Sequence, residues 1–141
     1  SLGEPVFDKF QAVLAQAMLS IPAVKGIEFG RGFEAAKSMT GAAHNDMFTL
    51  DSTDRIRPAT NNAGGLLGGI TTGENIYFRV AFKPVSSIGV PQETVDSEGN
   101  LTILEIEGRH DPCVLPRAPP IVEAMAAITT MDFLHRKLAP V

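Results

Sequence analysis

The stretch Ile76-Tyr77-Phe78-Arg79-Val80-Ala81-Phe82-Lys83 decides the fold class, because bulky apolar residues occupy every second position along it. Such strict alternation predicts a half-buried β-strand, and Pro84 ends its hydrogen-bonding ladder. Outward from this strand, residues 23–29 predict a second strand. Residues 92–95 and 101–107 predict a hairpin around the polar turn at residues 96–100.

Helical periodicity appears on both sides of these strands. Residues 4–20 predict an amphipathic helix with Pro5 in its first turn, and residues 33–37 predict a short helix. Residues 120–138 carry an apolar surface so broad that it predicts a helix buried on most sides. The sequence therefore predicts an α+β fold, an antiparallel sheet with packed helices.

Residues 38–75 have no sustained period, which is uncommon for so long a segment in a compact domain. They either build a site or are disordered. Within them, His44-Asn45-Asp46 is interpreted as a solvated polar loop. The run Gly64-Gly65-Leu66-Leu67-Gly68-Gly69 indicates either a turned loop or a backbone that a ligand approaches closely. Its spacing is neither a Walker loop nor a dinucleotide fingerprint.

Composition excludes several classes of protein. The 141 residues suit one domain, and a formal net charge of −4 argues against a nucleic-acid binder. No apolar run approaches the ~18 residues of a membrane span. The single cysteine, Cys113, is expected to be a small buried hydrophobe. No spacing indicates a metal site, and we expect a reducing, cytoplasmic compartment.

The start of the chain lacks a methionine, and a helical pattern follows almost at once. We therefore expect Ser1-Leu2 to be a cloning remnant and the chain to be a piece of a longer protein.

Two polar segments are candidates for chemistry. Arg109-His110-Asp111 offers a bidentate cation, a group that titrates near neutrality and a proton acceptor, directly before Pro112 and Cys113. The run Lys83-Pro84-Val85-Ser86-Ser87 offers a cation and two hydroxyls to an anion. The alternatives are a surface turn in which Arg109 pairs with Asp111, and a solvated lysine. Arg117 either joins an anion site or ends the loop before Pro119.

These segments, taken in order along the chain, resemble the chorismate synthase family. The resemblance covers almost the whole chain and is carried by Ser20–Gly26 with Gly30-Arg31-Gly32-Phe33, His44-Asn45-Asp46, Asn62–Gly65 with Gly68-Gly69-Ile70, Ala81–Pro84 with Ser86-Ser87-Ile88, and Arg109–Cys113 with Ala118 and Val122–Met125. Some relatives have asparagine at Pro22, which puts a polar contact there in doubt.

The resemblance implies an FMN-dependent lyase of the shikimate pathway, in aromatic amino acid biosynthesis. Members convert 5-enolpyruvylshikimate 3-phosphate into chorismate and phosphate, and they need reduced FMN but consume no net electrons. They fold as a βαβ sandwich and assemble as homotetramers. Residues 1–141 would be the C-terminal portion, which we expect to be inactive and to contact flavin only together with the rest of the enzyme.

The resemblance also implies residue roles. Asp111, near the reactive edge of the flavin, would assist proton movement, and Arg109 would face both cofactor and substrate; His110 completes the expected catalytic set. The expected cofactor-binding residues are Ala23, Gly68, Lys83, Pro84, Val85, Ser86, Ser87 and Arg109.

Two other hypotheses remain open from the residues alone. One is a small non-enzymatic binding or assembly domain, which the long helices and apolar content permit. The other is an independent phosphate-binding enzyme that uses Arg109 and Lys83. A solution mass and a flavin titration separate the first of these from the lyase.

Overall fold

A computed structural model describes residues 1–139; residues 140 and 141, at the end of the predicted domain, lie outside the described part. The chain is built of helices and antiparallel strand pairs, which confirms the α+β class. In order, the elements are α1 (Phe10–Leu19), β1 (Val24–Phe29), α2 (Gly32–Ser38), α3 (Gly41–His44), β2 (Phe48–Leu50), β3 (Ile56–Pro58), β4 (Leu66–Leu67), β5 (Ile70–Thr71), β6 (Phe78–Phe82), β7 (Gln92–Val95), β8 (Leu101–Leu104), a 3-10 turn (Leu115–Arg117) and α4 (Ala118–Leu138).

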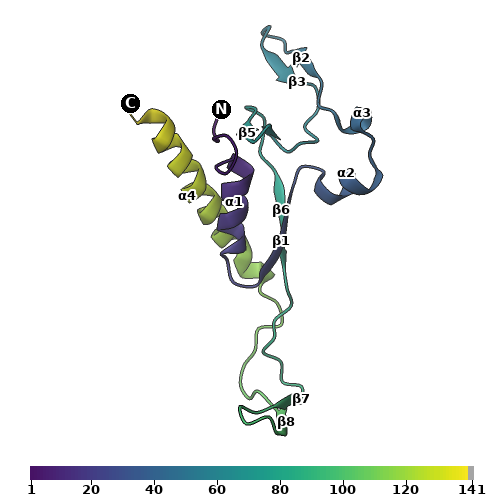
Figure 1. The fold of residues 1–141 in the computed structure, drawn as a ribbon, viewed down its shortest axis with the longest axis vertical. Helices are drawn as coiled ribbons and strands as arrows, with labels where there is room; N and C mark the ends of the chain where they lie inside the picture. Colours follow the sequence, from purple (N-terminus) through teal and green to yellow (C-terminus); the bar gives the residue numbers. More distant parts are fainter. Residues whose placement is uncertain (140–141) are drawn as a thin grey trace.

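The core lies where α1 packs between α4 and the β1–β6 pair (Figure 1). Phe10, Leu14 and Met18 recur at helical spacing on α1, and all three side chains are buried. From α4, Phe133 reaches the same cluster, with its ring centroid 5.2 Å from that of Phe10. The two helices, which lie near opposite ends of the chain, thus share one apolar interface.

Helix α1 begins at Phe10, so the prediction of a helix from residue 4, with Pro5 in its first turn, was wrong. Residues before Phe10 form a turn in which the Glu4 amide donates to the Asp8 carbonyl over 2.9 Å, and Val6 has a positive φ of 65°. The Phe10 amide donates to the Gly69 carbonyl over 2.8 Å. The helix starts there because a distant loop supplies the acceptor that its first amide needs.

The strands form separate pairs and do not join into one sheet. Among residues 1–139 there are four two-stranded antiparallel sheets. The longest pairs β1 with β6, from Val24 opposite Phe82 to Phe29 opposite Phe78; β6 is the strand that the alternating stretch predicted. The β7–β8 hairpin also forms at the predicted turn and extends away from the core (Figure 1).

Helix α4 is less buried than its broad apolar surface predicted. Its buried residues are Ala118, Thr129 and Phe133, whereas Ile128 is 64% exposed. The prediction of burial on most sides was wrong for this chain because α1 covers only one face of α4. In the described part of the chain, no helix combines the length and apolarity needed to cross a bilayer.

Residues 38–75 build defined structure around a buried carboxylate. Asp46, only 6% exposed, accepts hydrogen bonds from the Thr60 hydroxyl (2.6 Å) and from the Asn62 and Ala63 amides (both 2.8 Å). Burial raises the pKa of Asp46, but the bond from Thr60 and the two amide bonds outweigh it, so the pKa lies below its ordinary value. The interpretation of His44-Asn45-Asp46 as a solvated loop was therefore wrong at Asp46, which organises the turn before the glycine run.

Candidate functional site

The structure brings the neighbourhood of Ala23 against the end of β6. The Lys83 amide donates to the Ala23 carbonyl over 2.8 Å, which joins two segments sixty residues apart. Ala23 has a positive φ of 71°, a conformation that costs a residue with a Cβ roughly 1–2 kcal/mol. This strained backbone lies between α1 and β1, beside an open apolar pocket.

Replacing Ala23 with glycine is expected to stabilise the chain by about 0.5–1 kcal/mol, because glycine adopts positive φ without the steric cost. The measurement is the free energy of unfolding in denaturant. Gly26, which lies in β1 near Ala23 and does not have positive φ, gives the matched reverse change, Gly26→Ala. A less stable Ala23→Gly variant would show that the conformation of Ala23 is not strained in solution.

Two open pockets meet at Phe82 and Val114. The larger, of about 320 Å³, is lined by Ile21, Pro22, Ala23, Phe82, Val114, Arg117, Ala118 and Ile121. The smaller, of about 220 Å³, is lined by Phe82, Lys83, Pro84, Val85, Pro112, Cys113, Val114 and Leu115. Most of these side chains are apolar, and each pocket has one cation on its wall. Such a surface suits a ligand with an apolar body and anionic groups.

A cluster of charges lies along the same segment. Asp111 bridges two arginines: its Oδ1 is 3.3 Å from Nη2 of Arg109, and its Oδ2 is 2.7 Å from Nη1 of Arg117. The Arg109 side chain is 85% exposed and lines neither pocket. The predicted pairing of Arg109 with Asp111 exists, but the shorter contact comes from Arg117.

The other predicted residues of these segments are placed as follows. His110 is half-buried, with Nε2 3.1 Å from the Ile106 carbonyl, while Ser86 and Ser87 are exposed on the loop after β6. Cys113 is exposed, so its predicted burial was wrong; it lies in the irregular segment before the 3-10 turn, where the Leu115 amide donates to its Sγ.

Gly68 lies apart from the other predicted cofactor-binding residues. It forms the β4–β5 turn with Gly69, whose carbonyl caps the first residue of α1, whereas Ala23 follows the last turn of that helix. The ten residues of α1 span about 15 Å, and Figure 1 shows the two regions at opposite ends of it. A Cβ added at Gly68 would meet nothing within 4 Å, so its backbone is open to a ligand.

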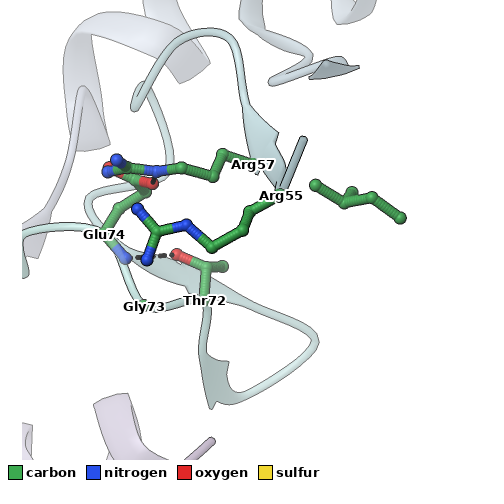
Figure 2. Close-up of a pocket in the computed structure, with 6 residues that line it drawn as sticks. Arg55, Arg57, Thr72, Gly73 and Glu74 are labelled. Atoms are coloured by element: carbon green, nitrogen blue, oxygen red, sulfur yellow. Dashed lines mark hydrogen bonds and ion pairs between the residues drawn. The ribbon is translucent and has the colours of Figure 1, made fainter. Parts of the chain in front are cut away.

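A further pocket of about 290 Å³ lies within residues 55–74, and no predicted site residue lines it. Figure 2 shows Arg57 alongside Glu74 and the Thr72 hydroxyl facing the Glu74 amide. Arg57 makes two bonds of 2.7 Å to Glu74, which lower the pKa of Glu74 and raise that of Arg57. Arg55 pairs with Asp51. The Glu74 carboxylate lies on the wall of this pocket and offsets the charge of its two arginines, so the pocket suits an anion poorly.

Sequence reasoning missed most of the walls of the two apolar pockets. Ile21, Phe82 and Val114 come from three separate segments, and their apolar character indicated only a general core. The role of Arg117 was left open, between an anion site and the end of the loop before Pro119; the structure places it at the end of the 3-10 turn that continues into α4.

Comparison with known proteins gives concordant matches. A family model described as Chorismate synthase matches residues 1–135. A relative named Chorismate synthase from Cytophaga hutchinsonii is 56% identical over 138 residues, which are 98% of this chain and 38% of the relative. One of the same name from Acaryochloris marina is 57% identical over 135 residues, 96% of this chain and 37% of the relative.

A solved structure, described as the crystal structure of chorismate synthase, superposes with a TM-score of 0.76 at 33% sequence identity. The match covers 98% of this chain and 34% of that one. The chain thus spans little more than a third of the length of the relatives that it matches.

Proposed function

Because the chain belongs to the chorismate synthase family, we propose that it supplies part of an FMN-dependent lyase that converts 5-enolpyruvylshikimate 3-phosphate into chorismate and phosphate. The remaining part would correspond to the length of the relatives that this chain does not span. The matches favour this function over an assembly domain or an independent phosphate-binding enzyme.

The observation that carries the proposal is the pair of apolar pockets that meet at Phe82, with Lys83 on one wall and Arg117 on the other. Flavin and substrate are both anions with an apolar or cyclic body. Once the rest of the enzyme covers these walls, the two cations would act on such anions more strongly than they do in water.

The residues present fit FMN. Ala23, Lys83 to Ser87 and Arg109 would hold it, with Ala23 and Lys83 joined through their backbones and Arg109 free to reach outward. Gly68 belongs to the same proposed set by its open backbone, although it lies at the other end of α1. The proposed set therefore comes from four segments: the loops that carry Ala23, Lys83 to Ser87 and Arg109, and the β4–β5 turn that carries Gly68.

Reduced FMN would supply the transient electron density that helps phosphate leave, with no net change in redox state. The side chains of the protein would bind the ligands and move the proton. Arg109 presents donors to the oxyanions of cofactor and substrate, and Asp111 takes up or releases a proton at its carboxylate. His110, held by the Ile106 carbonyl, completes the proposed catalytic set. In the complete enzyme, the apolar walls around Phe82 would help to exclude water from the reacting groups.

A chimeric protein tests the proposal directly. In the Cytophaga hutchinsonii relative, the region matched by this chain is replaced with residues 1–141, a swap favoured by 56% identity. With reduced FMN and 5-enolpyruvylshikimate 3-phosphate, the chimeric protein is expected to release phosphate, while the isolated chain is expected to release none. Phosphate is measured under anaerobic conditions.

The chimeric protein needs two controls, oxidised FMN in place of reduced FMN and the unmodified relative. A folded chimeric protein that releases no phosphate, beside an active relative, would contradict the proposed function. Phosphate release by the isolated chain would contradict the expectation that further polypeptide is needed.

We further propose that the complete enzyme works as a homotetramer in the cytoplasm, without nucleic acid or membrane partners. Exposed apolar side chains on α4 and on the β7–β8 hairpin support association, because surfaces of this kind are usually covered in stable proteins. The solution mass of the chimeric protein tests the assembly.

A further inference from the structure

Arg117 is the one charged residue among those that line the larger apolar pocket. It closes the 3-10 turn directly before α4, and its side chain is 71% exposed. The family resemblance assigned no role to this position. It shares the lining of this pocket with Ala23 and Phe82, and the other lining residues are apolar.

The start of α4 has no amide left for an anion. Pro119 and Pro120 lack an N–H, and the Ala118 amide donates to the Leu115 carbonyl. The usual anion-binding capacity of a helix start is therefore absent here. At this end of α4, the Arg117 side chain still has N–H donors whose hydrogen bonds an anion could accept.

Arg117 also holds Asp111 more closely than Arg109 does. The contact between Arg117 Nη1 and Asp111 Oδ2, at 2.7 Å, has the length of a strong charge-assisted hydrogen bond, while the contact from Arg109 is 3.3 Å. A guanidinium carries five N–H donors, so this bond leaves most of them available.

Resting on the proposed function, we infer that Arg117 is a further binding residue of the site, which contacts an oxyanion of the bound ligand while it positions Asp111. The oxyanion belongs to the phosphate of FMN or to a phosphate or carboxylate of the substrate. The two sources share one chemistry, an anionic group on an apolar or cyclic body. The pocket at Arg117 provides a cation for the anionic group and apolar walls for the body.

The isolated chain, titrated with inorganic phosphate, gives the first test. Nitrogen–proton NMR is expected to show a saturable shift of the Arg117 Nε–Hε signal. Arg117→Met, which removes the charge but keeps the length, should weaken phosphate binding by about tenfold, and Arg117→Lys by less. Arg31→Met is the matched control, because Arg31 makes a comparable exposed ion pair, with Glu34 at 3.2 Å, and lines neither apolar pocket.

The chimeric protein gives the second test and separates the sources. Loss of affinity for FMN but not for riboflavin in Arg117→Met assigns the contact to the flavin phosphate. Unchanged FMN affinity with a KM for substrate raised about tenfold assigns it to the substrate. A folded Arg117→Met variant that keeps all three affinities would overturn the inference, as would an Arg117 signal in the isolated chain that phosphate does not shift.

These outcomes separate the inference from the proposed function. If the chimeric protein is inactive but phosphate shifts Arg117 in the isolated chain, the anion contact stands and the lyase proposal fails. If the chimeric protein is active and Arg117→Met leaves the affinities for FMN, riboflavin and substrate unchanged, the lyase proposal stands and the anion contact fails.

Discussion

Asp111→Ala in the chimeric protein is expected to slow phosphate release by about 100-fold or more, with FMN affinity kept within about threefold. The carboxylate lies between two guanidinium groups, which hold it in one place. Its loss removes a proton acceptor but leaves Arg109 and the apolar walls to bind the flavin. Steady-state rates and a flavin titration measure the two effects separately.

Asp132→Ala is the matched control for Asp111→Ala. Asp132 is an exposed aspartate that pairs with Arg136 at 2.7 Å, on the outer part of α4. Its removal is expected to change turnover little, because exposed ion pairs contribute only about 0–1 kcal/mol. Near-normal turnover in a folded Asp111→Ala variant would remove Asp111 from the proposed mechanism, whatever the control does.

Phe133→Ala is expected to destabilise the chain by about 3–5 kcal/mol. Phe133 is 2% exposed and packs against Phe10, which is 1% exposed, so the truncation leaves a cavity at the contact between α4 and α1. In a chain of this size the midpoint of thermal unfolding should fall by roughly 10 °C or more. Circular dichroism during heating measures it.

Ile128→Ala provides the control on the same helix. Ile128 is 64% exposed, and its truncation is expected to change stability by no more than about 0.5 kcal/mol. Equal losses in Phe133→Ala and Ile128→Ala would mean that the α1–α4 contact is not the core of the chain in solution.

Local patterns were enough to predict several elements. The alternation from Ile76 to Lys83 predicted β6, the polar run at residues 96–100 predicted the β7–β8 turn, and the helical spacing after Ala118 predicted α4. Each of these signals lies within one element, because the spacing of apolar residues and the residues of a turn involve only neighbours in sequence. The family resemblance then linked the segments to chorismate synthases, and the family match confirmed it.

Long-range contacts account for the predictions that were wrong. Helix α1 starts at Phe10 because the Gly69 carbonyl accepts its amide, and no signal near residue 4 encodes a partner so distant. Asp46 looked like a solvated residue, but Thr60, Asn62 and Ala63 return to bury it. The exposure of α4 depends on how much of it α1 covers. The apolar spacing within α4 does not predict that coverage.

The sequence by itself determined the α+β class, most of the elements and the segments with chemical potential, because those follow from local periodicity, turn residues and family motifs. Only the tertiary structure decided that Ala23 meets Lys83, that Arg117 holds Asp111 at the edge of an apolar pocket, and that Gly68 lies at the far end of α1. The physical reason is that contacts between distant segments depend on how whole elements pack. Packing is set by shape and burial across the entire chain.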